Sequence, residues 1–134
     1  MRKIQSQSTS NPTSVSQWAS VEALTGGNDC IIPMLKAFKE RHDFVVAELN
    51  KMKGVSCIEA DGTFYAFPSV QAAIEANSSI SNDVEFTSWV LDKAGVAVVP
   101  GSAFGTEGHV RLSFATSMET VSYTHLTLPT NREV

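Results

Sequence analysis

The sequence predicts an α/β sandwich with the element order helix, helix, strand, strand, helix, strand, strand. Three segments carry apolar residues three or four positions apart, which is typical of helices. Short runs of β-branched and aromatic residues lie between them, and glycine, proline and asparagine separate the segments. With 134 residues, 43% of them hydrophobic, the chain allows one domain and buries a core without needing a disulfide or a metal.

The first half of the chain contains two expected helices. Ser14 to Leu24 follows Pro12 and several capping hydroxyls, and the run Gly26-Gly27-Asn28-Asp29 ends it. The second and longest helix begins at Pro33, which the first turn of a helix tolerates, and continues through Lys53 to a glycine. Both helices are expected to present one apolar face.

The sequence pattern in the middle of the chain predicts a β-hairpin. Val55 to Glu59 and Thr63 to Phe67 are short strand-like runs on either side of Asp61-Gly62. An Asp-Gly pair between two such runs is a hairpin signal, because glycine accepts a positive φ. Pro68 ends the second run.

A third helix and two strands are expected after the hairpin. Asn82-Asp83 offers capping side chains for a helix that closes at Gly95. Val96 to Val99 is interpreted as a buried strand, and His109 to Phe114 alternates like a final strand.

Both ends of the chain are unusual. Ile4 to Pro12 is rich in β-branched and hydroxyl residues and is interpreted as a strand with no element to pair with. Thr116 to Thr120 looks like a helix cap and first turn, but no apolar stripe follows, so no helix is expected there. Val121 to Thr130 resembles translated transposase adapter DNA, which identifies residues 121–134 as an adapter-derived tail; the alternative is a genuine β-rich tail.

Composition excludes several classes of function. The net charge of −4 and the scattered carboxylates argue against nucleic-acid binding. No apolar run is long enough to cross a bilayer, and no signal core follows the first residues, so we expect a cytoplasmic protein with reduced thiols. The chain shows no nucleotide-binding loop. Its cysteines and histidines are too scattered for zinc-ligand spacing or for a catalytic triad. These residues are Cys30, Cys57, His42, His109 and His125.

Arg111 is the most informative charged residue. It interrupts the apolar run Val110 to Phe114, and the planar guanidinium holds a carboxylate through two parallel hydrogen bonds, which a lysine cannot do. The alternative is an edge-strand arginine that faces water. The turn Pro100 to Gly105 leads toward this strand, with glycines that allow close backbone approach. Gly62 to Pro68 is aromatic, and we expect its rings in the core, with a partner for the Tyr65 hydroxyl.

Four ordered motifs together resemble the C-terminal part of class I aminotransferases, with bacterial aspartate aminotransferases as the nearest likeness. They are residues 4–12, 62–68, 96–105 and 110–115. The resemblance implies a fold-type I enzyme dependent on pyridoxal 5′-phosphate. Residues 1–28 would be a remnant of the large domain, residues 29–120 the small domain with a truncated last helix, and the helix Pro33 to Lys53 the link between the two domains.

The resemblance assigns a substrate role to Arg111 alone. Its guanidinium would bind the α-carboxylate of an amino acid, with aspartate as the default substrate and a 2-oxo acid as the second. The turn Pro100 to Gly105 would lie near the active-site mouth, and the loop Ser8 to Pro12 near the interface of a homodimer. The chain offers no catalytic, cofactor-binding or metal-binding residue.

The lysine that forms the Schiff base in this family follows a serine, and no such pair occurs here. The lysines are Lys3, Lys36, Lys39, Lys51, Lys53 and Lys93. We therefore expect this chain to be inactive alone. Two other hypotheses remain: a non-catalytic α/β module that binds a small carboxylate or a protein, and a structural dimerisation piece. Trp18, Val21 and Leu24 are expected to expose an apolar stripe, which would favour self-association.

Overall fold

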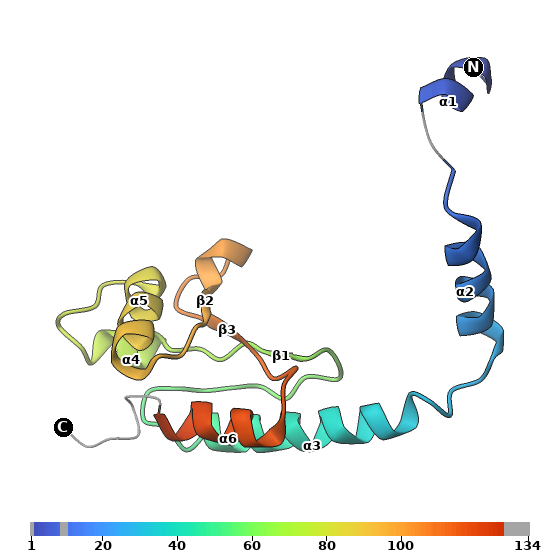
Figure 1. Ribbon diagram of the computed structural model, residues 1–134. Coiled ribbons are helices and arrows are strands. Elements are labelled where there is room, and N and C mark those ends of the chain that lie inside the picture. Colours follow the sequence, from blue (N-terminus) through green and yellow to red (C-terminus); the bar gives the residue numbers. More distant parts are fainter. Residues whose placement is uncertain (1, 9–10, 128–134) are drawn as a thin grey trace. The chain divides into compact units, whose positions relative to one another are not determined.

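The structure, a computed structural model, describes residues 2–8 and 11–127 (Figure 1). The chain divides into two compact units, Met1–Met34 and Leu35–Val134. Helices and a small antiparallel sheet alternate along the second unit. This mixture confirms the predicted α/β class.

The first unit is helical and carries no buried residue in its helices. Helix α1 spans Arg2–Ser8, so the strand expected from Ile4 is wrong. Helix α2 spans Ser14–Thr25, one residue longer than predicted. The expected apolar stripe is exposed, with Trp18 at 74% and Leu24 at 87%. Thr9 and Ser10 of the predicted interface loop lie outside the described residues.

Helix α3 spans Ile32–Leu49 and ends four residues before the predicted Lys53. The chain continues in turns, in which the amide of Met52 donates to the Leu49 carbonyl at 3.1 Å. Gly54 then has φ +80°, and a Cβ there would lie 2.7 Å from the Ala73 amide nitrogen. The close approach of two backbones at this glycine, together with its left-handed conformation, explains why the helix cannot extend through it.

The sheet has three short strands in the order β1-β3-β2, all antiparallel. Strand β1 is Tyr65–Ala66, β2 is Val99–Pro100 and β3 is Val110–Ser113. In the register, Tyr65 lies opposite Ser113 and Val99 lies opposite Arg111. The last strand of the sequence is therefore central, and it places Arg111 between the two edge strands.

The predicted hairpin forms only in part. Strand β1 pairs with β3, and the run 55–59 is joined to the returning chain by an isolated antiparallel bridge between Ser56 and Ser69. The side chain of Asn50 hydrogen-bonds the backbone of Cys57. It donates to the Cys57 carbonyl at 2.9 Å and accepts from the Cys57 amide at 2.8 Å. An amide side chain thus supplies the two hydrogen bonds that a neighbouring strand would make. The positive φ of this loop falls on Thr63, at 72°, and not on the glycine before it.

Two further helices follow β1. Helix α4, Gln71–Glu75, was not anticipated from the sequence. Helix α5, Asp83–Ala94, confirms the predicted third helix, since the Asn82 side chain accepts from the amide of Glu85 at 2.9 Å and Gly95 closes the helix in the left-handed conformation. Both ends of α5 therefore carry the caps that the sequence indicated.

The predicted buried strand Val96 to Val99 is mostly wrong. Val96 is buried, but the strand contains only Val99–Pro100, and Val99 is exposed. The chain then forms the 3-10 helix η1, Gly101–Phe104, which Gly105 ends with a positive φ. A Cβ at Gly101 would collide with the Thr106 carbonyl oxygen, which confirms the expected close backbone approach in this turn.

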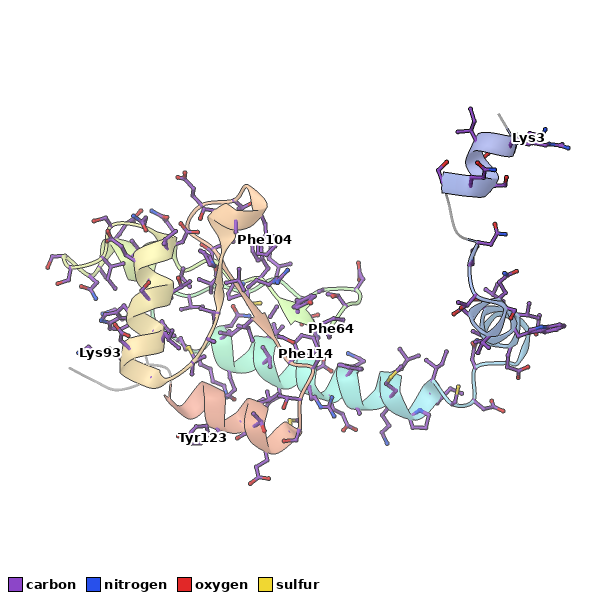
Figure 2. All side chains as sticks on the ribbon, turned by 45° about the horizontal axis from the view of Figure 1, so that its top comes forward. Lys3, Phe64, Lys93, Phe104, Phe114 and Tyr123 are labelled. Carbon is purple, nitrogen blue, oxygen red and sulfur yellow. The ribbon has the colours of Figure 1, made fainter. Side chains whose placement is uncertain are left out.

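Helix α6, Met118–Thr127, corrects the expectation that no helix follows Thr120. Ser117 caps it, because its Oγ accepts from the amide of Thr120 at 3.1 Å. Figures 1 and 2 show α6 beside α3, and Val121 is only 4% exposed within the same core cluster as Val45. The predicted origin of residues 121–134 in adapter DNA stays a prediction, and residues 128–134 lie outside the described part.

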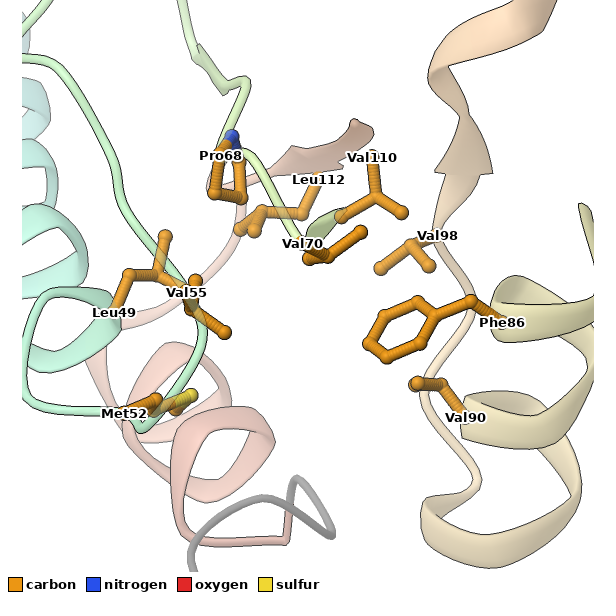
Figure 3. Close-up of a pocket in the computed structure, with 10 residues that line it drawn as sticks. All are labelled: Leu49, Met52, Val55, Pro68, Val70, Phe86, Val90, Val98, Val110 and Leu112. Atoms are coloured by element: carbon orange, nitrogen blue, oxygen red, sulfur yellow. The ribbon is translucent and has the colours of Figure 1, made fainter. Parts of the chain in front are cut away.

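The core of the second unit consists of two clusters. The first joins the buried face of α3 to Phe114 and Val121, and the second joins α4 and α5 to Val110. A small cavity of about 30 Å³ lies between them, lined only by apolar residues and by Pro68. Figure 3 shows Phe86 and Val90 facing this cavity from α5.

Across the described residues, no helix combines the length and apolar character that a membrane-crossing segment requires.

Candidate functional site

Arg111 lies in the middle of β3, the central strand of the sheet. Its neighbour Val110 is buried in the second core cluster, whereas Arg111 points to the opposite face and is half-buried. The guanidinium carbon lies 4.4 Å from the centre of the Tyr65 ring and 4.3 Å from that of Phe104. Figure 2 labels Phe104 on η1, above the strand.

The donors of the Arg111 guanidinium have no partner among the described residues. A guanidinium donates its hydrogen bonds within its own plane, so rings stacked on its faces do not compete with those donors. Among the described residues, Arg111 forms no ion pair, and Glu107 does not pair with it. A guanidinium with free donors presents a planar fork that suits the two oxygens of a carboxylate.

Arg111 lines an open pocket of about 540 Å³. Its walls come from α3, the loop after Cys57, strand β1, η1 and the start of β3. Besides Arg111, the lining residues are His42, Val46, Ile58, Glu59, Ala60, Thr63, Tyr65, Ala66, Phe67, Phe104 and His109. The pocket is therefore large enough for a small organic acid, and a cation lies on its wall.

Two histidines line the same pocket. His42 accepts a hydrogen bond at Nε2 from the amide of Ala60, at 3.0 Å, and its Nδ1 lies 3.0 Å from Asp43. Because Nε2 accepts, Nδ1 carries the proton and donates to the carboxylate. His109 donates from Nδ1 to the Glu107 carbonyl at 2.9 Å. The first of these bonds joins His42 on α3 to the loop after Cys57, and the last holds His109 against its own chain segment.

The aromatic segment Gly62 to Pro68 corrects a prediction. Its rings were expected in the core, but Phe64 and Phe67 are 40% and 38% exposed, and only Ala66 and Pro68 are fully buried. Phe67 stacks on His109 with 5.2 Å between ring centres and 18° between planes. Tyr65 packs against Arg111, and no partner for its hydroxyl occurs within the described part of the chain.

Sequence reasoning identified Arg111 but missed the two rings that hold it. Both rings lie in motifs that the sequence singled out separately, the aromatic run around Tyr65 and the glycine turn around Phe104. The missing signal was the register, because only the pairing of β1 with β3 brings Tyr65 next to this strand. The turn Pro100 to Gly105 does adjoin the pocket, through Phe104.

A buried carboxylate holds that turn in place. Asp83, the first residue of α5, accepts a hydrogen bond from the amide of Ser102 at 2.7 Å. Burial alone would raise the pKa of Asp83. The hydrogen bonds from Ser102 and from nearby backbone amides outweigh that effect and hold the pKa below its ordinary value. Asp83 is therefore ionised at neutral pH.

The described residues that line the Arg111 pocket do not fit pyridoxal 5′-phosphate. That cofactor requires a lysine amine within reach, and none lines the Arg111 pocket. The Nζ of Lys39 lines a neighbouring pocket but is bound to Asp43 at 2.9 Å, a contact that raises the pKa of Lys39. Lys51 pairs with Glu48 at 2.6 Å. Within the described residues no group of histidine, cysteine and carboxylate side chains is arranged to hold a metal, and the side chain of His125 lies outside them.

Comparison with known proteins identifies the family. The sequence-family model for class I and II aminotransferases matches residues 1–125. An aspartate/prephenate aminotransferase of Nitrosomonas europaea is 50% identical over 124 residues, covering 89% of this chain and 31% of that protein. An asparagine–oxo-acid transaminase of Streptococcus mutans is 42% identical over 121 residues, covering 90% and 30%. The chain thus spans about a third of the length of these curated relatives.

Solved structures agree with the family match. Aspartate aminotransferase from Rhizobium meliloti superposes with a TM-score of 0.84 at 38% identity, over 92% of this chain and 32% of the other. Aspartate aminotransferase from Thermus thermophilus, solved with maleate, superposes with a TM-score of 0.77 at 34% identity, over 93% and 31%. These matches confirm the expected family and the α/β fold. The chain belongs to the class I and II aminotransferases.

Proposed function

We propose that this chain forms the substrate-carboxylate site of a pyridoxal 5′-phosphate-dependent aminotransferase. The enzyme would transfer an amino group between an amino acid, with aspartate as the first candidate, and a 2-oxo acid. Arg111 would bind the α-carboxylate of the substrate. One observation carries this proposal: the guanidinium is oriented by two rings, faces an open pocket and forms no ion pair among the described residues.

The role of Arg111 is binding and orientation. Two parallel hydrogen bonds to a carboxylate fix both its position and its rotation, which a single ammonium contact does not. Fixing the carboxylate also fixes the direction of the bonds at the adjacent carbon, and such positioning raises reaction rates. The cofactor would be held by residues outside this chain, since no lysine lines this pocket.

The chain alone would bind carboxylates without catalysing transamination. The names of the curated relatives support aminotransferase activity for a protein about three times as long. We propose that the active form is a homodimer in which this segment is joined to a cofactor-binding part. The absence of a lysine at the pocket also supports the second candidate, a non-catalytic module that binds a small carboxylate.

A fusion tests the proposal directly. The chain would replace the matching C-terminal part of the Nitrosomonas europaea relative, and transamination of aspartate with 2-oxoglutarate would be measured. Arg111→Lys should raise KM for aspartate about 10- to 100-fold, because a hydrogen bond to a charged group contributes about 1.5–3 kcal/mol. Arg111→Gln should have a larger effect, since it also removes the charge.

Arg41→Gln is the matched control. The guanidinium carbon of Arg41 also lies over a ring, 5.3 Å from the centre of Phe38, but Arg41 does not line the Arg111 pocket. This variant should leave KM unchanged. An active fusion whose KM is equally insensitive to both arginines would refute the role of Arg111. An inactive but folded fusion that still binds maleate would favour the non-catalytic module.

A further inference from the structure

Asp83 is the only buried charged side chain among the described residues, with an exposed fraction of 2%. It is the first residue of α5, on the side of the sheet where the second core cluster lies. A carboxylate at the start of a helix is favourable because of the helix dipole, but an exposed one gains that benefit without losing water. Its burial therefore needs a further explanation.

The hydrogen-bond partner of Asp83 supplies one. Its Oδ2 accepts from the amide of Ser102, 19 residues further along the chain, at 2.7 Å. Ser102 belongs to η1, Gly101–Phe104, whose cap residue Pro100 makes no side-chain cap hydrogen bond. A carboxylate from another helix thus satisfies an amide at the start of η1, where amides have no partner within the helix itself.

The turn that Asp83 holds carries one of the two rings on Arg111. Phe104 is the last residue of η1, and its ring centre lies 4.3 Å from the Arg111 guanidinium carbon. Phe104 is 47% exposed, and apart from Arg111 its ring meets the Phe67 ring edge-on, with 6.3 Å between ring centres. The backbone position of Phe104 depends on the turn. The Gly101 amide ties this turn to the His109 carbonyl at 2.7 Å, and Asp83 ties it to α5 through Ser102.

We propose that Asp83 is a positioning residue for the carboxylate site: by anchoring η1 through Ser102, it holds Phe104 over the Arg111 guanidinium. The chain of contacts is Asp83 to Ser102, Ser102 to Phe104 along η1, and Phe104 to Arg111. Only the final step, the effect on substrate, rests on the proposed function. The geometric part concerns this chain alone.

The geometric part is tested by NMR on the 134-residue chain. Stacking between two rings shifts the side-chain protons of Arg111 upfield, and Phe104→Leu measures the share of that shift that Phe104 causes. Asp83→Ala should reproduce most of the change seen in Phe104→Leu. Asp83→Asn keeps a carbonyl oxygen for the Ser102 amide and should recover much of the wild-type shift. Asp92→Asn, an exposed carboxylate on the same helix, is the matched control and should change nothing.

Maleate titration of the same variants tests the effect on the site. Phe104→Leu and Asp83→Ala should each weaken maleate binding about threefold to tenfold, and Asp83→Asn should weaken it less. In the fusion enzyme, Asp83→Ala should raise KM for aspartate by a similar factor with kcat nearly unchanged, as expected for lost substrate binding. A purely structural role would reduce the amount of folded enzyme and leave KM as it is.

The outcomes separate the two proposals. An Arg111 shift that stays at the wild-type value in folded Asp83→Ala would overturn the positioning role. A shift that collapses while maleate affinity and KM do not change would overturn its functional part. Should Asp83→Ala fail to fold, Ser102→Pro decides, because it removes the amide that donates to Asp83 in the first turn of η1, and an unchanged Arg111 shift in that variant would contradict the inference. Failure of the proposed function would appear separately, as an Arg111→Lys variant with unchanged KM.

Discussion

Helices α2 and α5 both contain 12 residues but differ in almost everything that stabilises a helix. In α5, Asn82 caps the start, acidic residues occupy the first turn, Lys93 lies in the last turn, and Gly95 closes the end. Phe86 and Val90 are buried in the core. In α2, the cap residue Thr13 makes no side-chain hydrogen bond to a helix amide, and no residue is buried.

The difference shows that apolar periodicity predicts a helix, but it does not predict whether another part of the protein covers the apolar face of that helix. The apolar residues of α2 recur at helical spacing, yet the exposed fractions of Val15, Trp18 and Leu24 are 78%, 74% and 87%. Most of the stability of a helix in a protein comes from burial of such a face. We therefore expect α5 to be part of the cooperative core and α2 to be marginal in this chain.

The largest expected difference between the two helices is in the free energy of unfolding after one aromatic ring is removed from each. Phe86→Ala should cost about 3–5 kcal/mol of unfolding free energy, because it enlarges a cavity in a packed core. Trp18→Ala should change it by less than about 0.5 kcal/mol, because the exposed ring makes little core contact. Urea unfolding followed by circular dichroism measures both. Similar losses in the two variants would show that α2 is packed as well as α5.

Removing the helix caps should give a smaller difference. Asn82→Ala should cost about 1 kcal/mol, since it frees the Glu85 amide that its side chain now satisfies. Thr13→Ala should have almost no effect, because Thr13 Oγ1 contacts only the Ser16 hydroxyl, at 2.7 Å. Amide hydrogen exchange in the first turn of each helix provides the measurement. A cost at Thr13 equal to that at Asn82 would contradict the comparison.

Filling the cavity beside α5 should give a modest stabilisation. Val90→Ile adds one methylene next to a space of about 30 Å³ and should contribute up to about 0.8 kcal/mol. Val84→Ile, on the exposed side of the same helix, is the control and should be neutral. Thermal unfolding of both variants tests this. A destabilised Val90→Ile would mean that the cavity walls do not admit the extra carbon.

The smallest expected effect is that of pH on the free energy of unfolding, through Asp83 at the start of α5. Because the pKa of Asp83 is lowered in the folded chain, its ionised form stabilises the fold above the unfolded value of 3.8. This contribution should stay constant from neutral pH to about pH 5 and be lost as pH falls below 3.8, through the lowered pKa. Urea unfolding at a series of pH values, with Asp83→Asn as the reference, measures it. An equal acid loss in the variant would assign the effect to other carboxylates.

Local signals explain which elements could be predicted. Helix α5 was predicted because its cap, its apolar face and its final glycine all lie within the segment itself. Helix α6 was missed because its sequence shows a cap but no apolar stripe. It forms against α3 with Val121 in the core, a contact that depends on tertiary structure. The hairpin was reduced to the Ser56–Ser69 bridge for the same kind of reason, since the side chain of Asn50, seven residues earlier, hydrogen-bonds the backbone of Cys57.

The candidate site divides in the same way. Arg111 stood out because a charge inside an apolar strand requires a partner, which the sequence alone reveals. Tyr65 and Phe104 could not be assigned to it, because they come from separate segments, 46 and 7 residues away, that only the sheet register and the η1 turn bring together. Asp83 was predicted as a helix cap candidate, but its contact with Ser102 depends on the packing of α5 against that turn.

Thr63, on the wall of the Arg111 pocket, has a φ of 72°. A β-branched residue in this left-handed region loses about 1–2 kcal/mol relative to its preferred conformations, and glycine would avoid that loss. The rest of the fold must therefore hold this segment in place, and threonine has far fewer alternative shapes than glycine to visit. The entropy of ordering Thr63 is then lost when the chain folds and not when a ligand reaches the pocket.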